Sequence, residues 1–346
     1  MVYKNYTHGG DIYRNSVKLD FSVNINPLGM PDKVRDAIRL SADMSHIYPD
    51  PYCETLRRSL SLAHTVSVDD IICGAGAAEL IFQFMHALKP ARALIVEPTF
   101  SEYASALKCT GCDISSYELK AENGFILTDD ILTKITFDTE LLVICSPNNP
   151  TGIPVDHTLL GKIIERCHET NTWLFLDECF ITMSSGAKSM IPTLCDGDKV
   201  FVLRAFTKSF AMAGVRLGYG ICKNHCMLEK MCALSQPWNV SVTAQMAGVA
   251  ALSCTEFIEE TKLLIERERA YLEGQLDRLN EVYIKSVANF ILIRERDNLG
   301  ELLLKKGILI RDCSDFLGLK GYWRIAVRTR RENEQLIAAM KEIIDG

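Results

Sequence analysis

A lysine followed eight positions later by an arginine is the most reactive pair of side chains in the sequence. Lys208 lies among apolar and hydroxyl residues just after the apolar run Val200–Leu203, and Arg216 follows a short Ala-Gly-Val segment. A lysine amine with a lowered pKa can form a Schiff base, and a guanidinium suits a phosphate group. Taken singly, a surface lysine is the simpler interpretation, so the neighbouring segments carry the argument.

Three further segments place polar groups directly after apolar runs. Gly74–Glu79 leads into an expected helix, whose free backbone N–H groups could bind an anion, although a tight turn is the alternative. Ser146–Gly152 contains two prolines that would hold an amide in a rigid loop. Asp177 ends the run Trp173–Leu176, where a buried carboxylate needs a partner and a helix cap or salt bridge is the alternative. Ligands of open α/β sheets lie beyond the carboxyl ends of the strands, so these segments come first as candidates for a site.

Short apolar runs alternate with amphipathic stretches from about residue 54 onward. The runs are apolar at odd and even positions alike, which predicts buried, mostly parallel strands; they are Ala93–Glu97, Leu141–Cys145, Trp173–Asp177 and Val200–Arg204. The stretches between them have the length of crossover helices; they are Ala78–Lys89, Ser101–Lys108 and His157–Thr170. This alternation predicts an α/β fold with helices on both faces of the sheet.

The texture changes after Cys222, which predicts a second domain. Two long helices are expected over Ser241–Cys254 and Thr255–Leu279, followed by a compact α+β arrangement. Its strands are expected at Asn289–Arg294, Ile308–Arg311 and Tyr322–Val327, and its helices at Glu301–Lys306 and Arg331–Ile344. We therefore expect an N-terminal arm over residues 1–30, a large α/β domain over 31–235 and a small α+β domain over 236–346.

Composition limits the classes of function. The chain has 346 residues, a formal net charge of −6 and interspersed acids and bases, which favours a small-molecule partner over nucleic acid or a lipid surface. Its thirteen cysteines are an odd number scattered through apolar runs, which indicates a reducing cytosol. No apolar run approaches the roughly 20 residues of a membrane span, so a cytoplasmic location is expected.

Taken together, Asn-Pro-Thr-Gly, Asp-Glu, Thr-Lys and Ala-Gly-Val-Arg resemble the motifs of fold-type I pyridoxal-phosphate enzymes of the class I/II aminotransferase superfamily. The resemblance covers nearly the whole chain and implies a mostly parallel seven-stranded sheet and pyridoxal 5'-phosphate as the cofactor. It implies that Lys208 binds the cofactor covalently, that Asp177 pairs with the ring nitrogen and that Asn149 bonds to the ring hydroxyl. It implies that Phe100 stacks on the cofactor ring. For the cofactor phosphate it implies Ala77, Ala78, Thr207 and Arg216.

Two motifs point to a branch of this superfamily. Tyr48-Pro49-Asp50 is similar to a segment of histidinol-phosphate aminotransferases, whose tyrosine reaches the neighbouring subunit's cofactor phosphate, so a homodimer with shared sites is implied. Arg324 stands where the family binds the substrate α-carboxylate. The alternatives are a core tyrosine for Tyr48 and a structural ion pair for Arg324.

The ends of the chain are similar to L-threonine O-3-phosphate decarboxylases of cobalamin biosynthesis. The matching segments are His8–Gly10, Asp20–Gly29, Ile310–Ser314 and Arg328–Asn333. This similarity places Asn24 near the substrate and His8 near the entrance of the site. It favours decarboxylation of a small phosphorylated amino acid; transamination of histidinol-phosphate or aromatic substrates with 2-oxoglutarate, a non-catalytic cofactor-binding regulator and a plain nucleotide-binding protein are the alternatives.

The sequence departs from the family pattern at three places. Ala205 stands where the phosphate site usually has Ser or Thr, and Phe180 where many aminotransferases have a tyrosine. The segment Phe180–Met183 also lacks an expected acidic residue. Two cysteine-containing groups have metal-like spacing, but no second pair completes a zinc site, so no metal is expected; they are Cys109 with Cys112, and Cys222 with His225 and Cys226.

Overall fold

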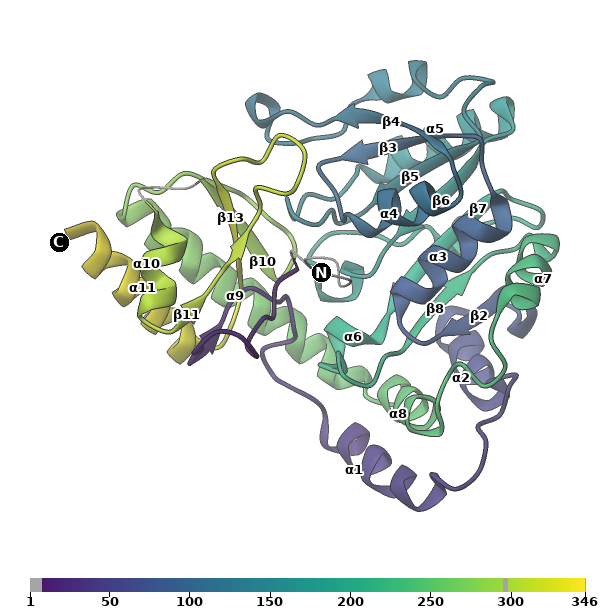
Figure 1. The fold of residues 1–346 in the computed structure, drawn as a ribbon, viewed down its shortest axis with the longest axis horizontal. Helices are drawn as coiled ribbons and strands as arrows, with labels where there is room; N and C mark the ends of the chain where they lie inside the picture. Colours follow the sequence, from purple (N-terminus) through teal and green to yellow (C-terminus); the bar gives the residue numbers. More distant parts are fainter. Residues whose placement is uncertain (1–7, 295–297, 346) are drawn as a thin grey trace.

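The computed structural model describes residues 8–294 and 298–345, and its largest feature is a mostly parallel sheet of seven strands (Figure 1). In spatial order the strands are β2 (Ile71–Gly74), β8 (Gly218–Ile221), β7 (Val200–Ala205), β6 (Trp173–Asp177), β5 (Leu141–Cys145), β3 (Arg92–Glu97) and β4 (Asp113–Glu118). Only β8 runs antiparallel to its neighbours, β2 and β7. The predicted sheet is therefore confirmed, and the expected apolar runs form its central strands.

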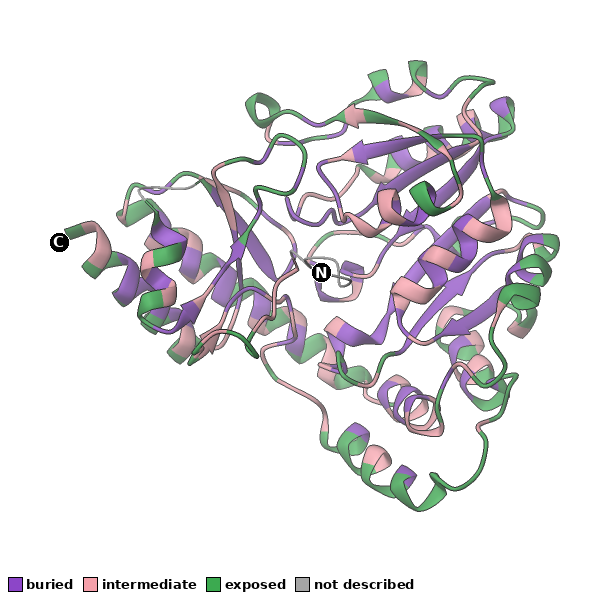
Figure 2. Ribbon diagram, viewed as in Figure 1, coloured by how far each residue is buried: buried purple, intermediate pink, exposed green. Residues whose placement is uncertain are grey.

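Helices cover both faces of this sheet. On one face lie α3 (Ala77–Leu88), α4 (Glu102–Cys109) and α7 (His225–Leu234); on the other lie α2 (Glu54–His64), α5 (His157–Thr170) and α8 (Val242–Leu252). Alternate residues of one strand enter the two cores: Leu142 faces α5, whereas Val143 faces α3. Every residue of β5, β6 and β7 is consequently buried (Figure 2).

A smaller group of elements lies beside the large sheet (Figure 1). Its four-stranded antiparallel sheet has the order β12 (Arg311–Asp312), β13 (Tyr322–Ala326), β10 (Phe290–Arg294) and β9 (Tyr283–Ile284). The helices here are α9 (Thr255–Arg278), α10 (Leu299–Lys305) and α11 (Arg330–Asp345). Strand β1 (Leu19–Asp20) pairs in parallel with β11 (Ile308–Leu309), which attaches the N-terminal segment to this part of the chain.

One strand prediction for this region is wrong. The expected strand Ile308–Arg311 is divided at Ile310, with β11 pairing with β1 and β12 pairing with β13. The division occurs because β1 offers an edge to the first half of the segment, whereas Trp323 and Arg324 offer one to the second half. The turn brings Arg311 next to Arg324 in the register of the small sheet.

The predicted boundary between residues 235 and 236 stays a prediction. Helix α8, which follows it, packs against α2 and α1 (Asp32–Ser41), whereas α9 packs against α11. In the described part of the chain, no helix combines the length and the apolar character needed to cross a membrane.

Candidate functional site

A cavity of about 260 Å³ lies beyond the carboxyl ends of the central strands, where the small sheet and the N-terminal segment face the large sheet. Strand β6 contributes Asp177 and the segment after β7 contributes Lys208, while Arg324 comes from β13. Every predicted site residue except Tyr48 lines this cavity; these are His8, Asn24, Ala77, Ala78, Phe100, Asn149, Asp177, Thr207, Lys208, Arg216 and Arg324. The fold thus brings together residues that are up to 316 positions apart, from 8 to 324.

Asp177 is a buried carboxylate with both oxygens occupied. Its Oδ1 accepts a hydrogen bond from the backbone N–H of Cys179 at 2.8 Å, and its Oδ2 accepts one from the hydroxyl of Tyr103 at 2.5 Å. Burial raises the pKa of Asp177, while these donors and the Arg204 guanidinium act in the opposite direction. The donors therefore favour the ionised carboxylate in a site where burial disfavours it.

Lys208 lies in the short helix α6 (Phe206–Ser209), directly after the last residue of β7. Its backbone oxygen accepts a hydrogen bond from the backbone N–H of Asn26 at 3.1 Å, which ties the N-terminal segment to this turn. Burial, followed by the positive charges of Arg324 and Arg216, lowers the pKa of the Lys208 amine to about 8. About a tenth of the amine is therefore neutral and nucleophilic at pH 7, far more than for a lysine with its ordinary pKa.

The N-terminus of α3 and the side chain of Arg216 meet at one end of the cavity. Gly76 precedes α3 with φ +94°, and a Cβ there would lie only 2.5 Å from Nη2 of Arg216. Glycine is thus needed both for the backbone conformation and for the approach of the guanidinium. Ala77, Ala78 and Thr207 line the same cavity, so backbone N–H groups, a hydroxyl and a positive charge are available to an anion there.

The loop that carries Asn149 is fixed by its neighbour. The Asn148 side chain donates to the Pro98 oxygen at 2.9 Å and accepts from the Thr99 hydroxyl at 3.0 Å. These bonds join the loop after β5 to the loop after β3. As a result, the Asn149 amide faces the cavity, where its Oδ1 accepts a hydrogen bond from Nη1 of Arg324.

Two buried arginines from the small sheet face the same cavity. Nη2 of Arg324 donates to the Ser22 oxygen at 2.8 Å, but its buried Nε has no hydrogen-bond partner among the described residues. Arg311 pairs with Asp315 at 2.7 Å and stacks over the Phe316 ring at 5.2 Å. Burial lowers the pKa of Arg324 to about 10, so the guanidinium remains charged near neutral pH.

Asn24, His8 and Phe100 complete the cavity wall. The buried Oδ1 of Asn24 has no hydrogen-bond partner among the residues described. His8 lies 3.0 Å from Glu102 and its ring approaches that of Phe100 at 5.6 Å. Asn24 therefore offers an unused acceptor to a ligand, and His8 contacts the aromatic side chain that faces the cavity.

Tyr48 lies outside the cavity of its own chain. Its side chain is 77% exposed and stacks on Trp238 with the ring centroids 4.5 Å apart. The alternative of a core tyrosine is thereby wrong, since this residue lies on the surface.

Two of the three departures from the family pattern, Ala205 and Phe180, lie at the site. Ala205 ends β7 in the cavity wall, and Phe180 also lines the cavity, where it packs edge-on against Phe290 at 5.0 Å. Neither side chain can donate the hydrogen bond that a hydroxyl would supply.

Sequence reasoning missed several residues of the cavity wall: Ser22, Tyr103, Cys145, Cys179, Arg311 and Phe316. Arg311 lies within the segment Ile310–Ser314, which is similar to the decarboxylases. A charged residue in that segment could therefore have indicated a substrate-binding role. Tyr103 follows Phe100 by three positions, one helical turn, but only the fold shows that its hydroxyl reaches Asp177.

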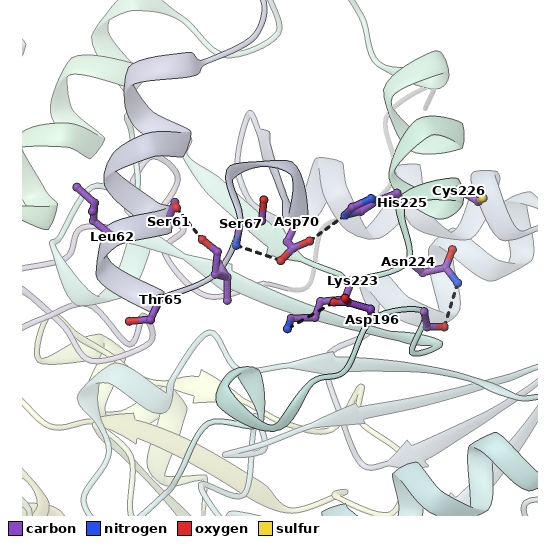
Figure 3. A pocket seen from close by; sticks show the side chains of 12 residues that line it. Ser61, Leu62, Thr65, Ser67, Asp70, Asp196, Lys223, Asn224, His225 and Cys226 are labelled. Carbon is purple, nitrogen blue, oxygen red and sulfur yellow. Dashed lines mark hydrogen bonds and ion pairs between the residues drawn. The ribbon is translucent and has the colours of Figure 1, made fainter.

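A second hollow, of about 980 Å³, lies away from these residues between the end of α2, the segment that precedes β2 and the start of α7 (Figure 3). Its charged side chains pair with each other: His225 contacts Asp70 at 2.9 Å, and Lys223 contacts Asp196 at 3.8 Å. Within residues 8–294 and 298–345, no group of three or more His, Cys, Asp or Glu side chains could hold a metal ion. This statement covers the two cysteine-containing groups with metal-like spacing, one at Cys109 and the other at Cys222. The charged side chains of this hollow thus already have partners of opposite charge.

Comparison with known proteins identifies the family. The family profile described as aminotransferase class I and II matches residues 16–340. Threonine-phosphate decarboxylase from Salmonella typhimurium is 37% identical over 100% of this chain and 99% of its own, and histidinol-phosphate aminotransferase from Methanococcus maripaludis is 32% identical over 93% and 89%.

The solved structures agree with this result. The histidinol-phosphate aminotransferase from Clostridium acetobutylicum superimposes with a TM-score of 0.88 at 29% identity, covering 94% of this chain and 99% of that one. The predicted fold and superfamily are therefore confirmed, and the chain is an enzyme of the class I/II superfamily, whose members depend on pyridoxal phosphate. It belongs to the aminotransferase class I and II family.

Proposed function

We propose that this protein binds pyridoxal 5'-phosphate and decarboxylates a small phosphorylated amino acid, with L-threonine O-3-phosphate as the best candidate. The observation that carries the proposal is the pair of buried guanidiniums, Arg324 and Arg311, in one small cavity with Lys208. Two fixed positive charges suit a substrate that has both a carboxylate and a phosphate. The full-length similarity to the Salmonella threonine-phosphate decarboxylase supports the same substrate class.

The residues of the cavity fit the cofactor. Asp177 would pair with the ring nitrogen, Asn149 would bond to the ring hydroxyl and Phe100 would stack on the ring. Thr207, Arg216 and the backbone of Ala77 and Ala78 would hold the phosphate. When bound, the cofactor withdraws electrons from a bond at the α-carbon of the amino acid.

The protein's own groups then orient the substrate and move the proton. Nε of Arg324 and Oδ1 of Asn24 are buried without partners among the described residues, so each can bind substrate without losing an existing bond. Arg324 would hold the carboxylate and Arg311 the phosphate, and the orientation that they impose decides whether CO₂ or the α-hydrogen is lost. The Lys208 amine, with its pKa of about 8, can donate a proton to the α-carbon after loss of CO₂.

Transamination with 2-oxoglutarate is the second candidate. Its support is the similarity to histidinol-phosphate aminotransferases, which extends over 93% of the chain. The same Lys208 amine would then move the α-proton. The two reactions use the same residues and differ in which group at the α-carbon is lost.

A homodimer with shared sites and a reducing, cytoplasmic location belong to the proposal. Exposed apolar side chains occur in the sequence segment around Tyr48 and at Trp238, which stacks on Tyr48, and a second copy would cover them; they are Leu40, Met44, Ile47, Tyr48, Tyr52 and Trp238. In that dimer, Tyr48 would reach the cofactor phosphate of the partner. All thirteen cysteines lie in the described residues and none forms a disulfide, which supports a reducing compartment.

Product analysis tests the reaction directly. Purified protein loaded with pyridoxal 5'-phosphate is given L-threonine O-3-phosphate with and without 2-oxoglutarate, and Lys208→Ala is the blank. An aminopropanol phosphate formed without the keto acid supports decarboxylation. Glutamate formed only with the keto acid supports the aminotransferase, whereas cofactor binding with no product in either arm contradicts L-threonine O-3-phosphate as the substrate.

A further inference from the structure

Asp177 has an electrostatic problem that the fold must solve. All five residues of β6 are buried, and Asp177 itself is only 4% exposed. A carboxylate in such surroundings tends to keep its proton. A protonated Asp177 could not hold a positive charge on a neighbouring ring nitrogen, so the site needs donors that stabilise the ionised form.

Tyr103 is one of these donors, and its hydroxyl also lies beside the thiol of Cys145. The side chain is fully buried on α4, and its ring packs edge-on against Phe100 at 5.7 Å and at a tilt against Phe175 at 6.0 Å. Phenylalanine could make these ring contacts equally well. The hydroxyl is thus explained by its 2.5 Å hydrogen bond to Oδ2 of Asp177.

The direction of this hydrogen bond is fixed by the surroundings. Burial and the negative charge of Asp177 raise the pKa of the Tyr103 hydroxyl well above its ordinary value, so the phenol keeps its proton and acts as the donor. Oδ1 of Asp177 is held separately by the Cys179 N–H at 2.8 Å. The two bonds fix the plane of the carboxylate while its remaining lone pairs stay available to the cavity.

From this geometry we infer that Tyr103 is a positioning residue, which keeps Asp177 ionised and oriented toward the ring nitrogen of the bound cofactor. The inference rests on the proposed function, because it concerns the cofactor. It also connects two parts of the cofactor's surroundings. The segment Phe100–Tyr103 would stack on the ring through one residue and secure the carboxylate through the other.

Loss of the Tyr103 hydroxyl has a predictable electronic effect. With one donor fewer, the proton shared by Asp177 and the ring nitrogen moves toward Asp177, so the ring carries less positive charge. A less positive ring repels a proton on the attached Lys208 nitrogen less strongly. That nitrogen therefore keeps its proton to a higher pH. The pH midpoint of the cofactor's visible absorption band should therefore rise in Tyr103→Phe.

Other titratable groups surround this site and remain the same in the variant. Those facing Asp177 are Cys145 on β5, Cys179 on the following loop and Arg204 on β7. Those facing Lys208 are Arg324, Cys179, Arg216 and Asp20. A change in midpoint caused by a single removed hydroxyl is thus assigned to the Tyr103–Asp177 bond.

The test is an absorbance titration of the cofactor-loaded protein from acid to alkaline pH. We expect the midpoint of Tyr103→Phe to lie about one pH unit above wild type, a tenfold change in proton affinity, and the dissociation constant of the cofactor to increase. Tyr219→Phe is the matched control, because it removes a buried hydroxyl that contacts His64 at 2.7 Å outside the cavity. Its midpoint should equal that of wild type.

A double variant separates a positioning role from general loosening. In the Asp177→Asn background, the charge that Tyr103 serves is absent, so adding Tyr103→Phe should shift the midpoint no further. Equal midpoints in wild type and Tyr103→Phe would overturn the inference while leaving the proposed function in place. Equal shifts in Tyr103→Phe and Tyr219→Phe would overturn it too, and a wild-type protein with no cofactor band would overturn both.

Discussion

The two walls of the cavity differ in how far their polar groups are satisfied. On the large-sheet wall, both oxygens of Asp177 accept hydrogen bonds, and Asn148 bonds to the neighbouring loop. On the wall formed by the small sheet and the N-terminal segment, Nε of Arg324 and Oδ1 of Asn24 are buried without partners among the described residues. On one wall the protein's own hydrogen bonds already hold the polar groups in place, whereas the other has buried polar atoms without a partner.

This difference separates two tasks of the same cavity. A cofactor that stays bound through many turnovers benefits from a preorganised wall, because its charges need no rearrangement during the reaction. A substrate that enters and leaves needs groups whose buried hydrogen-bonding capacity is unused until it arrives. The predictions below test this division by changing one wall at a time.

Lys208→Ala should have the largest effect, because this side chain serves both walls. It removes the covalent attachment of the cofactor and the group that moves the proton, so turnover should fall by about 10⁴-fold or more. Mass spectrometry after borohydride reduction should show cofactor fixed to the wild-type chain and none to the variant. Cofactor fixed to another lysine would contradict the assignment.

Changes at the two arginines should separate carboxylate from phosphate recognition. Arg324→Gln should lower kcat/KM by about 100-fold for every amino-acid substrate, since charge-assisted bonds are lost. Arg311→Gln should cause a similar loss only for phosphorylated substrates. Steady-state kinetics with L-threonine O-3-phosphate and L-threonine measures the difference.

A surface arginine provides the control for these two variants. Arg330 pairs with Glu268 at 2.9 Å and stacks on Tyr271 at 3.9 Å without lining the cavity. Arg330→Gln should leave kcat/KM unchanged. Equal losses for both substrates in Arg311→Gln would show that this guanidinium does not read the phosphate.

The sequence predicted the large-sheet wall better than the opposite wall, for a physical reason. Asp177, Asn149 and Lys208 each follow an apolar run, and parallel strands bring their carboxyl ends to one edge of the sheet. The strands β4 and β8 were missed because β4 has no buried residue and β8 has two glycines in four residues. Neither shows the continuous apolar pattern that marks a buried strand.

The opposite wall depends on contacts that have no local signal. Arg311 reaches the cavity only because the expected strand Ile308–Arg311 is divided and its second half turns to pair with β13. A contact without a local signal also occurs on the large-sheet wall, where Tyr103 and Asp177 are separated by 74 positions and neither sequence segment indicates the other. The motifs identified the residues that resemble a family, whereas side chains that position them had to come from the fold.

The rate at which the protein binds the cofactor should depend on pH through the protonation state of the Lys208 amine. Its pKa of about 8 means that the neutral amine increases about tenfold per pH unit below that value and then levels off. Stopped-flow absorbance after mixing cofactor-free protein with pyridoxal 5'-phosphate measures the rate. Arg324→Gln should move the midpoint upward, because the Arg324 charge helps to lower this pKa.

The opposite result has a clear meaning. A rate that continues to rise beyond pH 10 in the wild-type protein would show that Lys208 behaves like an exposed lysine. The positive charges that face it would then have no influence on its reactivity.

Ala205→Ser should have the smallest effect and acts only on the large-sheet wall. Ala205 is 9% exposed at the end of β7 and lines the cavity beside Thr207, so a serine hydroxyl there could donate one more hydrogen bond to the cofactor phosphate. One net hydrogen bond stabilises by about 1 kcal/mol, which corresponds to roughly a fivefold lower dissociation constant. Equilibrium dialysis measures the constant, with Ala205→Val as a control that adds bulk without a hydrogen-bond donor. Because the substrate contacts lie on the opposite wall, KM should stay unchanged.

Two results would contradict this prediction. Tighter cofactor binding accompanied by a changed KM would show that the two walls are coupled. Equal binding by the serine and valine variants would show that no phosphate oxygen lies near residue 205.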